Sequence, residues 1–158
     1  MTLLHSSRPI VLQPGEGQAI PGPGGLTLKA SADQTNGSIG FLEATSEPGF
    51  SGPVHIHHGS DELFYVLGGR FQFLVGEDVV DATAGSFVFI PRGTVHGPKV
   101  VGSEPGRVVM AFVPGGPERS FEEFAELFAT QDGAPDLTGD RAQAIARKYR
   151  SEFVGPPL

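Results

Sequence analysis

Short apolar runs, separated by glycine, proline and other turn residues, make up most of the first 114 residues of the chain. Several runs alternate apolar with polar side chains, and most are rich in β-branched and aromatic residues, which is typical of strands. Asn36-Gly37 predicts a tight turn, and Gly68-Gly69 predicts a two-residue hairpin. We expect strands at residues 10–12, 26–30, 38–44, 55–57, 63–67, 70–75, 79–82, 87–90, 94–101 and 108–113.

The pattern becomes helical after residue 117. An apolar stripe at helical spacing predicts an amphipathic helix that covers the strands, in preference to a substrate lid. Ser120 and Glu123 fit a capping box at its start. A second helix is expected at 140–150. We therefore divide the chain into an all-β barrel with an N-terminal arm at 1–117, whose core is 36–114, and a C-terminal helical extension packed on it at 118–158. The residues of the stripe are Phe121, Phe124, Leu127 and Phe128.

Length and composition restrict the class of protein. The chain has 158 residues, which suits a single domain. Its 23 glycines and 14 prolines show no period and fit the turns of a β-barrel. A net charge of −7 argues against a nucleic-acid partner, and no apolar run is long enough to span a membrane. Without cysteine or an N-terminal apolar leader, we expect a cytoplasmic protein.

Three histidines and one glutamate stand in an order that can hold a metal. His55 and His57 are two residues apart, so a strand points both imidazoles to one side. A polar turn precedes Glu62, and Pro91-Arg92-Gly93 precedes His96. Three nitrogens and one carboxylate suit a divalent transition metal and leave coordination positions open, as in catalytic sites. Unrelated surface histidines, or a barrel that holds no metal, are the alternatives.

The same residues resemble the two cupin motifs. Residues 49–69 match G-x5-HxH-x4-E-x6-G, and residues 85–96 match G-x5-PxG-x2-H. The asparagine that ends the second family motif is replaced by Val100, which does not affect the ligands. The resemblance, which covers about a third of the chain, implies a double-stranded β-helix (jelly-roll barrel) with one metal ion. It assigns His55, His57, Glu62 and His96 as ligands.

Residues 140–150 and 152–158 give a narrower resemblance, to actinobacterial small cupins of the quercetin 2,3- or flavonol 2,4-dioxygenase-like type. This implies an oxygenase that acts on a small aromatic or enediol-type substrate with O2. Iron, nickel, manganese and cobalt are the expected metals, with zinc and copper as alternatives. Glu62 is the candidate catalytic residue, as metal ligand or proton acceptor. A non-redox cupin enzyme (isomerase, decarboxylase, lyase or polyketide cyclase) and a small-molecule-binding cupin remain open.

Alternation along the strands also suggests which side chains line the interior. Residues that share a strand face with a ligand point inward with it, although a one-residue slip would reverse every orientation. His58, next to a ligand, is expected on the outer face. We expect a homodimer that forms through a sheet face or the N-terminal arm, because apolar outer faces of barrel sheets are usually covered. The candidate pocket residues are Phe41, Phe64, Phe73, Met110 and Phe112.

Overall fold

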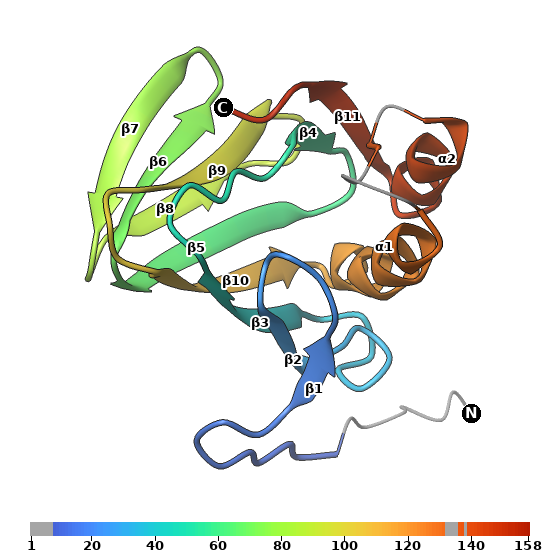
Figure 1. Cartoon of the computed structure of the whole chain (residues 1–158). Helices are drawn as coiled ribbons and strands as arrows, with labels where there is room; N and C mark the ends of the chain where they lie inside the picture. The colour runs from blue at the N-terminus through green and yellow to red at the C-terminus, as the bar shows by residue number, and fades with distance from the viewer. Residues whose placement is uncertain (1–7, 132–135, 138) are drawn as a thin grey trace.

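Two antiparallel sheets face each other in the computed structural model, which describes residues 8–131, 136–137 and 139–158 (Figure 1). One sheet has the order β1 (Gln18–Ile20), β2 (Leu26–Ala30), β3 (Gly40–Ser46), β10 (Gly106–Val113), β5 (Asp61–Gly68) and β8 (Phe87–Ile90). The other has the order β11 (Ser151–Gly155), β4 (Val54–His57), β9 (His96–Val101), β6 (Arg70–Val75) and β7 (Asp78–Thr83). The predicted all-β, double-stranded β-helix fold with C-terminal helices is confirmed.

The core lies between the sheets, and strand alternation explains its composition. On β5, Glu62, Phe64 and Val66 are buried, whereas the intervening Tyr65 is 48% exposed. On the neighbouring strand β10 the inward-facing apolar side chains are buried in the same way, and Ala111 on the other face is buried as well. Burial of these side chains is the main favourable contribution to folding. Other buried core members are Leu42, Phe71, Phe73, Ile90, Val100, Val108, Met110 and Phe112.

Gly68 and Gly69 do not form the predicted hairpin. β5 and β6 belong to different sheets, so this corner carries the chain from one sheet to the other. Gly69 has a φ of 71°, and a Cβ atom there would lie 2.4 Å from the carbonyl oxygen of Pro105. Gly69 therefore allows a left-handed corner under a close backbone contact. A local turn signal could not reveal that the two strands pair with other partners.

The N-terminal region also differs from expectation. Residues 10–12 are exposed and lie outside the strands of the described chain, so the predicted early strand is wrong. The first strand is instead the three-residue β1, within a stretch that reads as turns. β1 pairs with β2 at the sheet edge, where few side chains are buried and the pattern is weak. At Asn36 and Gly37, both φ values are positive, as the predicted turn requires.

Two helices and a last strand follow the barrel. After the 3₁₀ turn η1 (Pro117–Arg119), α1 (Ser120–Ala129) and α2 (Asp140–Lys148) lie side by side near β11 (Figure 1). The predicted capping box is wrong, because the Ser120 hydroxyl donates to the carbonyl of Pro117. Glu123 instead accepts hydrogen bonds from Lys148 and Tyr149, which joins α1 to the end of α2. The expected helical extension therefore also contains β11, a strand of the barrel sheet.

Glu118 is a fully buried carboxylate that fixes the connection between β10 and α1. Its two oxygens accept the backbone N–H groups of Ala32 and Gly116, each at 2.6 Å. Paired in this way, a buried carboxylate replaces much of the hydration that it loses. A Cβ on Gly40 would lie 2.1 Å from a Glu118 oxygen, so the close approach requires glycine there.

An apolar surface remains on the outer face of β5 and β8. Tyr65, Leu67, Phe87 and Phe89 are 40–60% exposed there. This surface is a candidate for the sheet-face contact of the expected homodimer, and the homodimer stays a prediction. Within the described parts of the chain, neither helix has the length and apolar character needed to cross a membrane.

Candidate metal centre

The predicted ligands converge inside the barrel. One nitrogen from each of His55, His57 and His96 and one oxygen of Glu62 all lie within 4.8 Å of one another. His55 and His57 share the inner face of β4, and His96 at the start of β9 pairs with His55. Glu62 reaches the histidines from β5 in the opposite sheet. The centre therefore lies between the sheets, and the prediction that these four residues lie together is confirmed.

Short contacts join the four side chains through Nε2 and Oε2. Glu62 Oε2 is 2.7 Å from His96 Nε2, 3.2 Å from His57 Nε2 and 3.9 Å from His55 Nε2. The Nε2 atoms of His55 and His57 are 3.1 Å apart. His96 and Glu62 are almost fully buried, whereas the His55 side chain is 15% exposed. Among the four, His55 thus lies nearest to solvent.

Burial and mutual charge perturb the acidity of this group. Burial, followed by the charges of His96 and His57, lowers the pKa of His55 to about 3. Burial alone would raise the pKa of Glu62, but hydrogen bonds from His57 and His96 outweigh it, and the pKa falls well below its usual range. Burial opposes protonation of His96, yet hydrogen bonding and attraction to Glu62 raise its pKa. A proton on His96 would have to leave when a cation binds.

The donor set fits a divalent transition metal. Three imidazole nitrogens and one carboxylate oxygen combine intermediate and hard ligands, and one negative charge partly neutralises a dipositive ion. The opposite ring nitrogens of His55 and His96 lie 2.8 Å from the carbonyl oxygens of Pro53 and Thr94, which leaves Nε2 free to bind. Three Nε2 atoms and one carboxylate oxygen therefore point to one centre that suits more than one divalent ion.

Aromatic rings surround the histidines on the side of the C-terminal extension. The ring centroid of Phe112 lies 5.1 Å from that of His57, and the ring centroid of Phe153 lies 6.4 Å from that of His55. Phe153 in turn contacts Phe124 of α1. Sequence patterns did not identify Phe153, because a five-residue strand after a helix carries little periodic signal.

The candidate pocket residues do not share one position. Phe64, Phe73, Met110 and Phe112 are buried between the sheets, and their role as a substrate pocket stays a prediction. Phe64 and Phe73 pack on each other with ring centroids 4.9 Å apart. Phe41 lies on the opposite face of β3 from the buried Leu42 and Ala44, so its predicted inward orientation is wrong.

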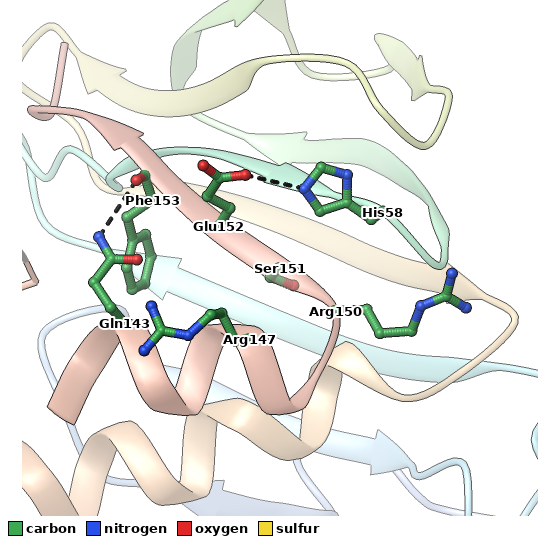
Figure 2. A pocket seen from close by; sticks show the side chains of 7 residues that line it. All are labelled: His58, Gln143, Arg147, Arg150, Ser151, Glu152 and Phe153. Carbon is green, nitrogen blue, oxygen red and sulfur yellow. Dashed lines mark hydrogen bonds and ion pairs between the residues drawn. The ribbon is translucent and has the colours of Figure 1, made fainter. Parts of the chain in front are cut away.

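A surface hollow of about 510 Å³ lies along α2 and β11 (Figure 2). Residues of α2 and β11 line it, together with His58 and Arg150. His58 is exposed and pairs with Glu152 at 3.2 Å, as Figure 2 shows, so it lies on the outer face as expected. Ser151 lines the hollow and also lies 2.7 Å from His57 Nδ1.

Asp61 and Arg92 join the two ligand-bearing segments. Nε and Nη2 of Arg92 donate to the two oxygens of Asp61, each at 3.0 Å, and its backbone N–H donates at 2.9 Å. Asp61 directly precedes Glu62, and Arg92 lies in the turn before His96. This bidentate pair therefore ties the turn to β5.

Replacement of Asp61 by asparagine should change the pH dependence of stability. Hydrogen bonds from Arg92 lower the pKa of Asp61 from 3.8 to about 2. A lowered pKa contributes stability above pH 3.8, and this contribution disappears as the pH falls through about 2. As the pH falls across this range, the difference in free energy of unfolding between the wild type and Asp61→Asn should shrink, as measured by urea unfolding. Arg92→Gln should remove the same pH-dependent part of the free energy of unfolding. A difference between the wild type and Asp61→Asn that does not change with pH would contradict the assignment.

Comparison with known proteins agrees with this architecture. The family model of the cupin domain matches residues 42–112. Over 57 residues the chain is 35% identical to an uncharacterized protein of Streptomyces coelicolor, a match that covers 36% of this chain and 53% of the relative. The chain thus spans about half the length of that curated relative.

Solved structures show the same fold at low identity. An RmlC-like cupin from Shewanella frigidimarina is 21% identical with a TM-score of 0.59, covering 70% of this chain and 95% of the other. KdgF from Halomonas sp. is 18% identical with a TM-score of 0.56 and coverages of 66% and 93%. A predicted oxalate decarboxylase from Thermotoga maritima is 22% identical, with a TM-score of 0.55 and coverages of 56% and 78%. The match to the cupin domain model therefore covers residues 42–112, and this segment contains all four side chains that converge at the candidate centre.

Proposed function

We propose that this protein is a metal-dependent cupin oxygenase, related in activity to quercetinase-like dioxygenases, that acts on a small aromatic or enediol-type substrate. One observation carries the proposal: four ligand atoms, three nitrogens and one oxygen, lie within 4.8 Å inside the barrel. A structural zinc site is normally closed by four protein ligands in tetrahedral geometry, often with cysteine. Iron, nickel, manganese and cobalt accept more ligands, which leaves positions for a substrate oxygen and O2.

The surroundings of the histidines suit an aromatic substrate. His55 is the most exposed of the four side chains, so we propose that substrate approaches from its side. Phe153 next to His55, and Phe112 next to His57, provide ring faces and edges against which a planar molecule can pack. Apolar walls with a few polar anchors are typical of small-molecule sites.

Each ligand side chain has a separate role in this proposal. A bound divalent ion would supply Lewis acidity and, if redox-active, the means to reduce O2. His55, His57 and His96 would hold it through Nε2, with their rings oriented by contacts at Nδ1. Because the pKa of Glu62 is low, the carboxylate stays ionised and supplies the compensating negative charge. Glu62 is also the candidate to accept a proton from a substrate hydroxyl, a role that its low pKa in the metal-free site disfavours.

Metal analysis of the tag-free protein by mass spectrometry is the first test. We expect about one iron, nickel, manganese or cobalt ion per chain, because the described residues contain one such cluster of candidate ligands. The double variant His55→Ala/His57→Ala should lose the ion. The loaded protein should then consume O2 with flavonols or other enediols, measured with an oxygen electrode.

The other outcomes identify the alternatives. About one zinc per chain without O2 uptake would favour a non-redox isomerase, decarboxylase, lyase or cyclase, in which the same Lewis acid stabilises an enolate. Oxalate decarboxylases are among the structural relatives, but at 15–22% identity they share only the fold. Absence of metal after reconstitution would contradict both enzymatic functions and leave a barrel that binds a small molecule.

A further inference from the structure

Two of the three histidines are oriented by the backbone of their own segment. His55 Nδ1 lies 2.8 Å from the carbonyl oxygen of Pro53, and His96 Nδ1 lies 2.8 Å from that of Thr94. A carbonyl oxygen can only accept, so Nδ1 carries the hydrogen in both rings. The lone pair of Nε2 then points toward the centre, as metal binding requires.

His57 has a different partner. Its Nδ1 lies 2.7 Å from the hydroxyl oxygen of Ser151, which follows it by 94 residues and lies beyond the matched cupin domain. Strand pairing explains the contact, because β11 pairs with β4 in a register that places Ser151 directly opposite His57. The hydroxyl can donate its own proton to the carbonyl of Tyr149 at 3.4 Å. In that arrangement the oxygen accepts from His57, which gives this ring the same tautomer as the other two.

We infer that Ser151 is a positioning residue of the metal centre: its hydroxyl orients the His57 ring and directs Nε2 toward the ion. The C-terminal extension is then part of the centre as well as a cover for the barrel. This inference rests on the proposed metal-dependent function. Partners of this kind typically contribute about 10- to 100-fold to metal affinity, because a misoriented ring or the wrong tautomer weakens the bond.

Several contacts hold Ser151 in place. The side-chain amide of Gln143 on α2 donates to the backbone carbonyl of Phe153, and the backbone N–H of His58 donates to the backbone carbonyl of Arg150 at 2.7 Å. Tyr149 and Lys148, just before β11, both bond Glu123 of α1. The position of the hydroxyl therefore depends on how α1, α2 and β11 pack together, and the extension is coupled to the geometry of His57.

The test compares zinc affinity among full-length variants by competition with a chromophoric chelator. Ser151→Ala should bind Zn²⁺ about 10- to 100-fold more weakly than the wild type. Ser151→Thr keeps the hydroxyl and suits a strand, so it should retain affinity. Val154→Ala is the matched control, since Val154 lies on β11 with its side chain exposed to solvent. Thermal unfolding of each metal-free variant reports whether β11 remains in place.

When the wild type binds zinc, two results would overturn the inference. One is equal zinc affinity in Ser151→Ala and the wild type. The other is an equal loss in Val154→Ala, which would assign the effect to strand docking. If the wild type binds no zinc, the metal-dependent function fails. The imidazole ¹⁵N shifts of the metal-free protein then test whether the Ser151 hydroxyl orients the His57 ring. A change at His57 Nδ1 in Ser151→Ala supports the positioning contact, and an unchanged shift refutes it.

Discussion

Replacing His96 by alanine is expected to weaken binding of a divalent transition metal by more than about 100-fold, beyond the range for the loss of an outer partner. His96 is 1% exposed, and its Nε2 lies 2.7 Å from Glu62 Oε2 at the centre of the cluster. Alanine removes one of three nitrogen donors from a site too buried for water to replace it freely. Any activity should fall with the loss of metal. Zinc titration against a chelator, with metal content per chain, measures the effect.

His58→Ala is the matched control for this experiment. His58 is adjacent to a ligand in sequence, but its side chain is 48% exposed and pairs with Glu152 on the outer face. Its removal should leave metal affinity within the error of the titration. Full occupancy and activity in His96→Ala would remove that residue from the site, and an equal loss in His58→Ala would show that the assay detects any missing histidine.

Replacing Phe112 by alanine is expected to lower the free energy of unfolding by about 3–5 kcal/mol, the range for large-to-small changes of a buried aromatic side chain. Phe112 is fully buried on β10, between β3 and β5. Its ring centroid lies 5.1 Å from that of His57 and 6.3 Å from that of Phe121. Loss of the ring therefore leaves a cavity between the candidate metal centre and α1. Urea unfolding of the metal-free protein measures this without a contribution from ligand binding.

Val113→Ala provides the comparison on the same strand. Val113 follows Phe112 directly, points to the opposite face and is 40% exposed. Its replacement should lower the free energy of unfolding by less than about 1 kcal/mol, as is usual for surface positions. Phe112→Leu keeps much of the apolar volume, so its loss of unfolding free energy should lie between those of Val113→Ala and Phe112→Ala. A loss no larger in Phe112→Ala than in Val113→Ala would mean that the ring does not contribute to the core as its burial indicates.

The alternation of side chains along a strand explains why the candidate ligand residues could be predicted from the sequence. Alternation alone places His55 and His57 on one face of a strand, and it also places Glu62, Phe64 and Val66 together. Period-two patterning is a property of the extended backbone and does not depend on the strand's partner. The boundaries of β2, β6 and β8 agree with prediction for the same reason, since turn residues border each run.

Relationships between distant segments required the tertiary structure. Gly68 and Gly69 look like a hairpin, but pairing assigns β5 and β6 to different sheets. The inward face of β3 depends on register, and the structure places Leu42 inside and Phe41 outside. The capping box failed because the Ser120 hydroxyl bonds the Pro117 carbonyl and Glu123 bonds the end of α2. Residues 10–12 stay exposed, so this apolar run has no buried face to hold it in a sheet.

The sequence by itself therefore determined the fold class through alternation within short segments, and the spacing of the cupin-like motifs identified the four side chains of the candidate centre. The tertiary structure alone decided what surrounds those ligands. Ser151 and Phe153 come from a strand near the C-terminus, and only its pairing with β4 brings them to His57 and His55. Strand pairing is set by the summed burial and hydrogen bonding of the whole barrel, which no local pattern of five residues records.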